Sequence, residues 1–162
     1  MTRSVIVGMD DTDDSRNALA RAAELARVTH VKLVVVHVRH LAVFETRENL
    51  DVIEAMAREN TDHVLRGTGL DWEFVVRNGD PAHELMDVAS QRSATAIVVG
   101  GRPHRAPASA ALGSVTAALV HRFHGSVLVV RTGDSDWHQA DTALSLSTDQ
   151  AIDAIYGERM PE

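Results

Sequence analysis

Residues 96–114 read AIVVGGRPHRAPASAALGS, which is the most informative segment of the chain. An apolar, partly β-branched run without polar alternation leads into Gly100-Gly101, as in a strand that is covered on both faces. A loop of small residues and arginines follows, and helical character resumes at Gly113-Ser114. The first N–H groups of a helix, together with a serine hydroxyl, favour an anion. The other interpretation, in which Ser114 only caps its helix and the glycines only turn the chain, stays open.

Similar apolar runs recur on both sides of this stretch, and segments of helical period separate them. The other four predicted strands are at residues 5–7, 33–36 with Val38, 74–76 and 127–130. The predicted helices are a first one with the stripe Leu19, Ala22, Ala23 and Ala26, a second over residues 46–66, a third from Asp80-Pro81 and a fourth from Gly113-Ser114. This alternation predicts an α/β fold, a single doubly wound sheet of five mainly parallel strands with helices on both faces.

In such sheets a ligand binds beyond the carboxyl ends of the strands, where the winding direction reverses. The residues that matter most are therefore those that follow the first and fourth strands, at 8–12 and 100–104. We expect Asp11, Asp13 and Asp14, with Ser15, to cap the first helix. The negative charges of the aspartates would also suit the positive end of its dipole. That assignment leaves Asp10 for a ligand.

Composition narrows the class of protein. The chain has 162 residues, 44% of them apolar, which suits one globular domain with a substantial core. It has no cysteine, so disulfides, thiolate metal sites and cysteine nucleophiles are excluded. Its longest apolar runs reach about half of the roughly 20 residues that span a membrane. We find no secretory signal at the start and expect a cytoplasmic protein.

Charge is distributed unevenly along the chain. Residues 132–162 carry seven carboxylates against a single arginine, whereas residues 1–131 are almost neutral. We therefore predict a domain at 1–131 and an acidic extension at 132–162, in which Ile152, Ile155 and Tyr156 would form one face of a short amphipathic helix. A nearly neutral body offers no basic surface to phosphate backbones, so nucleic acid is a poor candidate partner.

The spacing within residues 96–114 resembles a motif of the universal stress protein family, G-x2-G-x9-G-[ST]. Here it maps onto Gly100, Pro103 and Gly113-Ser114. Four further segments are similar to the family and extend the likeness over residues 3–131: Val7-Gly8-Met9-Asp10, Val36-His37-Val38, Gly79-Asp80-Pro81 and residues 126–131.

This resemblance implies a dimeric stress-response protein that binds ATP or another adenine nucleotide. Asp10 would meet the ribose and Val38 the adenine, while the motif residues would hold the phosphates. The complete predicted nucleotide-binding set is Gly8, Asp10, Val38, Gly100, Arg102, Gly113, Ser114 and Val115. Mg²⁺ could accompany the ATP, but the sequence predicts no protein metal site, because His121 and His124 lack an evident third ligand.

The family resemblance also implies a homodimer. The last strand, with Val127, Leu128, Val129 and Val130, would lie at the edge of the sheet in the family's strand order. An apolar edge strand invites pairing with another chain, and two-fold dimers are the commonest oligomers.

Pro103 departs from the motif, in which the second position is glycine. Proline has no N–H and a fixed φ, so one potential phosphate donor is lost. Losing such a bond to a charged oxygen costs about 1.5–3 kcal/mol, or one to two decades of affinity. Two alternatives therefore stand beside nucleotide binding: a protein-interaction dimer of the same fold without nucleotide and, ranked last because no general base is evident, a slow ATPase.

Overall fold

The computed structural model describes residues 3–10, 12–39, 47–101 and 113–131. They form one sheet of five strands, in the order β3-β2-β1-β4-β5, and every neighbouring pair is parallel. The strands are β1 (Ser4–Gly8), β2 (Lys32–Arg39), β3 (Trp72–Asn78), β4 (Ala94–Gly100) and β5 (Ser126–Val130). The predicted α/β fold is confirmed.

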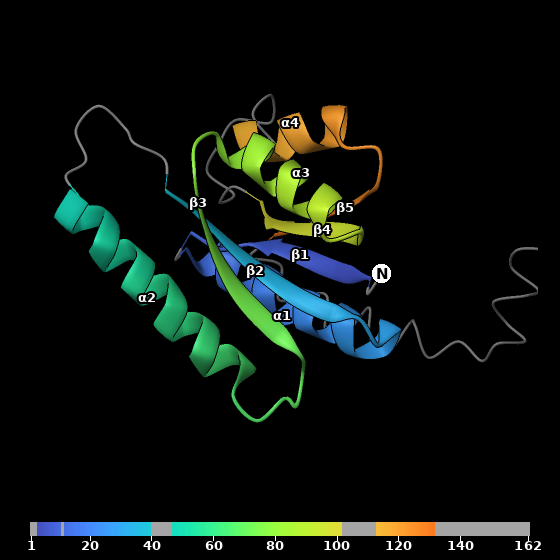
Figure 1. The fold of residues 1–162 in the computed structure, drawn as a ribbon, viewed down its shortest axis with the longest axis horizontal. Helices are drawn as coiled ribbons and strands as arrows, with labels where there is room; N and C mark the ends of the chain where they lie inside the picture. The colour runs from blue at the N-terminus through green and yellow to red at the C-terminus, as the bar shows by residue number, and fades with distance from the viewer. Residues whose placement is uncertain (1–2, 11, 40–46, 102–112, 132–162) are drawn as a thin grey trace, which may run out of the picture. The chain divides into compact units, whose positions relative to one another are not determined.

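Within the described part of the chain, helices cover both faces of the sheet (Figure 1). They are α1 (Asp13–Thr29), α2 (Arg47–Leu65), α3 (Pro81–Gln91) and α4 (Ser114–Arg122). Alternate residues of β1 point to opposite faces, so Val5 and Val7 pack with α1 and α2, while Ile6 packs with α3 and α4. Because both faces are covered, the central strands are apolar at consecutive positions.

The observed start of α1 corrects one prediction. The N-cap of α1 is Thr12, whose hydroxyl oxygen accepts a hydrogen bond from the backbone N–H of Ser15. Asp13 and Asp14 lie in the first turn, where their charge suits the helix dipole, but they are not its cap. Threonine competes well with aspartate at this position, since either side-chain oxygen reaches the free N–H groups. Asp11 lies outside the described residues.

The third and fourth helices begin where the sequence predicts. Asp80 caps α3 by accepting from the N–H of His83, and Pro81 is its first residue. Gly113 is the N-cap of α4 and Ser114 its first helical residue. The interpretation in which Ser114 caps the helix is therefore wrong.

The winding direction reverses between β1 and β4. These two strands are direct neighbours in the middle of the sheet, and Val7 pairs with Val98. The carboxyl ends of both strands, at Gly8 and Gly100, consequently lie side by side, as predicted. Within the described ranges no helix has the length and apolar character to cross a membrane. The predicted extension at 132–162 lies outside those ranges.

Candidate functional site

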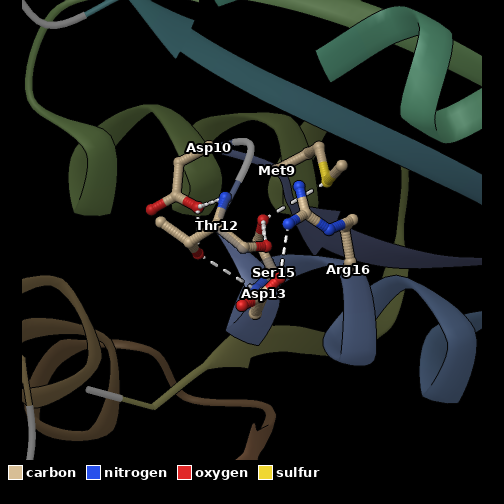
Figure 2. Close-up of polar contacts among 6 residues, drawn as sticks. All are labelled: Met9, Asp10, Thr12, Asp13, Ser15 and Arg16. Atoms are coloured by element: carbon tan, nitrogen blue, oxygen red, sulfur yellow. Dashed lines mark hydrogen bonds and ion pairs between the residues drawn. The ribbon is translucent and has the colours of Figure 1, made fainter. Parts of the chain in front are cut away.

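The loop between β1 and α1 holds Asp10 in a defined orientation (Figure 2). Its carboxylate oxygen Oδ1 accepts two hydrogen bonds from Thr12, one from the backbone N–H at 3.2 Å and one from the hydroxyl at 2.6 Å. The first bond makes an Asx turn, which redirects the chain into the helix. Asp10 is exposed, and its second oxygen makes no hydrogen bond with any described residue. Asp10 is thus engaged on one side and open on the other.

The residue before Asp10 is anchored by three separate contacts. The N–H of Met9 donates to the carbonyl of Val36 at 2.9 Å, and its own carbonyl accepts from Nδ1 of His37 at 2.8 Å. The hydroxyl of Ser15 lies 3.4 Å from the Met9 sulfur. Met9 is buried, so β2 and α1 together fix the base of the loop that carries Asp10.

His37 is a functional candidate that the sequence reasoning did not single out. Its side chain is only 3% exposed, and its ring stacks on Phe74 with 6.4 Å between the centroids. Cζ of Arg58 lies 4.5 Å from the centroid of the same phenylalanine ring. Because the Met9 carbonyl can only accept, Nδ1 of His37 carries the hydrogen. His37 therefore ties the end of β2 to the Asp10 loop.

Gly100 lies where the first turns of two helices approach the end of β4. A Cβ at this position would stand 2.8 Å from both the carbonyl carbon and the Cβ of Asp14 in α1. From the opposite face, the hydroxyl of Thr116 in α4 donates to the Gly100 carbonyl at 3.4 Å. Only glycine permits this close contact between the end of β4 and Asp14. The positive ends of two helix dipoles thus meet at one strand end.

The start of α4 lacks the side-chain cap and the first-turn acid that α1 and α3 have. α1 and α3 each have a side-chain cap and an acidic residue in the first turn. The N-cap of α4 is Gly113, which makes no side-chain cap bond, and its first turn contains no acid. Its first N–H groups therefore suit an anion. Ser114 is exposed at this end, and Val115 is partly buried.

The structure brings most of the predicted set to the carboxyl edge of the sheet. Gly8 ends β1, and a Cβ at this position would meet Leu85 and Val99. Val38 lies near the end of β2 and packs on the core shared with α3 and α4. Arg102 and Pro103 lie outside the described residues.

His121 and His124 do not lie on one helix. α4 ends at Arg122, so His124 lies beyond the helix on which the pair was expected. In the described part of the chain, no three acidic or histidine side chains converge as a metal site.

Comparison with known proteins identifies the family. The model of the universal stress protein family matches residues 1–131. The chain belongs to this family. Among curated relatives of this universal stress protein, YxiE of Bacillus subtilis is 27% identical over 148 residues, covering 81% of this chain and all of YxiE. Sll1388 of Synechocystis is 23% identical over 150 residues, covering 78% of this chain and 96% of Sll1388.

Solved structures of other universal stress proteins share the fold. One from Archaeoglobus fulgidus superposes with a TM-score of 0.68 at 24% identity, covering 80% of this chain and 99% of that chain. Another, solved in complex with cAMP, has a TM-score of 0.66 and 29% identity, and the match covers 82% of this chain and 98% of that chain.

Proposed function

We propose that this universal stress protein binds an adenine nucleotide, with ATP as the leading candidate, at the carboxyl ends of β1 and β4. The protein would act as a dimeric regulatory module of the stress response. The observation that carries the proposal is the position of Gly100, next to the uncapped start of α4 and beside the strand that leads to Asp10.

The phosphates would bind at the start of α4. The N–H groups of Ser114, Val115 and Thr116 lack intrahelical acceptors because they lie in the first turn. A triphosphate there would be favoured by the helix dipole, and no acid of that turn would oppose it. Mg²⁺ would come with the nucleotide, as is usual for ATP, rather than from a protein cage.

The ribose would bind at Asp10, and the adenine at Val38. The open oxygen of Asp10 is a charged acceptor, and ribose hydroxyls are donors that match it. Val38 would supply apolar surface and backbone groups to the base, and Gly8 would line the site with its backbone. The relative in complex with cAMP, at 29% identity, supports an adenine nucleotide as the ligand class.

Isothermal titration with ATP, AMP and cAMP tests the proposal. We expect saturable binding of at least one of them with one site per chain. Asp10→Ala should weaken the affinity about tenfold or more, since it removes a charge-assisted hydrogen bond. Asp13→Ala is the matched control, because this substitution also removes one negative charge. Asp13 is exposed and pairs with Arg16. No saturable binding by the unmodified protein would refute the nucleotide proposal.

A second candidate function, a protein-interaction dimer that does not depend on nucleotide, is favoured by the edge strand. β5 is the last strand of the sheet, so one side of its backbone has no neighbouring strand among the described residues. Leu128 is exposed on this strand, and Val127 and Val129 are only partly buried. A second copy that adds its own β5 would satisfy the free edge and cover these side chains. This dimer is compatible with nucleotide binding and would remain if the pocket were inactive.

A further inference from the structure

Thr12 joins Asp10 to the first turn of α1 through a chain of hydrogen bonds (Figure 2). The Thr12 hydroxyl donates its proton to Oδ1 of Asp10 at 2.6 Å and accepts from the N–H of Ser15 at 3.2 Å. The backbone N–H of Thr12 donates to the same carboxylate oxygen at 3.2 Å. One hydroxyl therefore serves both as the cap of α1 and as a donor to Asp10.

These bonds restrict an exposed carboxylate that would otherwise rotate. An exposed aspartate usually samples several rotamers, because water satisfies it in each of them. Here two donors of Thr12 converge on Oδ1, and the other oxygen points away from Thr12. Met9, immediately before, is fixed by Val36 and His37. Both the backbone and the side chain of Asp10 are thus set before any ligand arrives.

We propose that Thr12 is a positioning and specificity-determining residue, which aims the open oxygen of Asp10 at the ribose hydroxyls of the bound nucleotide. This inference rests on the proposed function. Thr12 itself does not contact the nucleotide in this arrangement. Its effect is to make the site discriminate between ribonucleotides and deoxynucleotides, in addition to any effect on overall affinity.

The physical basis is the difference between a fixed and a mobile acceptor. A fixed carboxylate oxygen forms a hydrogen bond with a hydroxyl that lies at the correct place, which increases the affinity. An analogue without that hydroxyl loses this bond. A mobile carboxylate can rotate and form a hydrogen bond with water when the hydroxyl is missing. The deoxy analogue then loses little affinity relative to the ribonucleotide. Donation from the Ser15 N–H to Thr12 also polarises the hydroxyl bond to Asp10, which strengthens the chain.

The experiment compares the affinities of ATP, 2′-deoxy-ATP and 3′-deoxy-ATP in four proteins. They are the unmodified chain, Thr12→Val, Thr12→Ser and the control Asp13→Asn. Valine matches threonine in shape but can neither donate nor cap, whereas serine keeps the hydroxyl. Asp13 lies in the same turn, so its variant changes the local charge without touching Asp10. Circular dichroism establishes that each variant is folded, and Thr12→Ala replaces the valine variant if the latter is not.

We expect at least one deoxy analogue to bind the unmodified protein about tenfold more weakly than ATP. Thr12→Val should bring this ratio close to one, while Thr12→Ser and Asp13→Asn keep it. A merely structural cap would lower stability without changing the ratio. An unchanged ratio in Thr12→Val, or equal binding of all three nucleotides to the unmodified protein, overturns the inference and leaves the proposed function intact. Absence of any nucleotide binding overturns both.

Discussion

The backbone of Asp14 lies against Gly100 so closely that a Cβ on the glycine would stand 2.8 Å from the Asp14 carbonyl carbon. Real Cβ atoms do not approach backbone at that distance, so α1 or β4 would have to shift. The glycine that begins the family-like motif therefore also determines how α1 packs on the sheet.

Gly100→Ala should destabilise the fold by about 1–3 kcal/mol, as overpacking of a tight contact does. Urea unfolding measures the change. Gly8→Ala is the matched control, since its Cβ would meet Leu85 Cδ1 at 3.4 Å, an ordinary contact. Equal effects of the two substitutions would show that the Asp14 contact is not the cause.

His37→Phe should lower both stability and nucleotide affinity. It preserves an aromatic ring beside Phe74 but leaves the carbonyl of buried Met9 without its donor, which costs about 1–3 kcal/mol. Because Met9 precedes Asp10, the loop that carries Asp10 and the proposed ribose contact should relax as well. Unfolding and titration with ATP give the two readouts.

Phe74→Leu provides the comparison for His37→Phe. It removes the stacked ring without affecting the bond between His37 and Met9, so stability should fall while ATP affinity remains. A loss of affinity in Phe74→Leu that equals the loss in His37→Phe would contradict the role given to His37 in the Asp10 loop.

Leu128→Lys should shift the proposed dimer toward monomer by at least tenfold in dissociation constant. Leu128 is 42% exposed on the edge strand β5, and a lysine there would place charges of the same sign across a two-fold contact. Sedimentation velocity over a range of concentrations detects the shift. Val120→Lys on α4 changes an apolar residue that is 50% exposed elsewhere and should have no effect. A monomeric unmodified protein would contradict the dimer outright.

Pro103→Gly should raise ATP affinity by about one to two decades, because it restores a backbone N–H where the family motif has glycine. This expectation comes from the sequence alone, since Pro103 lies outside the described residues. Calorimetry with both proteins measures it. Unchanged affinity would mean that position 103 gives the phosphates no donor.

Much of the fold could be predicted from the sequence because its signals are local. Continuous β-branched runs located the strands, and Leu19, Ala22 and Ala26, predicted as the inner stripe of the first helix, are all fully buried. Asp80-Pro81 predicted a helix start because the cap and the proline act within one turn. The adjacency of β1 and β4 was expected from the rule that the winding of such a sheet reverses at its ligand site, and the sheet order confirms that the two strands are neighbours.

The details of the site depend on contacts between distant residues, which periodicity does not report. The bond from His37 to Met9 joins residues 28 positions apart, and the contact of Gly100 with Asp14 joins two elements. The choice of Thr12 over its acidic neighbours as cap was a local event, but several adjacent residues could have filled that role. The sequence therefore predicted that the ends of β1 and β4 meet, and misassigned the N-cap of α1 within the Asp10 loop.

Titration of the ¹⁵N-labelled protein with ATP, followed by NMR of the backbone amides, determines whether the nucleotide binds at the carboxyl ends of β1 and β4. The amides of Gly8, Gly101 and Ser114, at the carboxyl edge of the sheet, should shift together and saturate. The amides of Gly67 and Gly69, which line a separate pocket between α2 and β3, should remain unchanged. Shifts confined to Gly67 and Gly69, or no saturable shift at the carboxyl edge, would contradict the proposed nucleotide site.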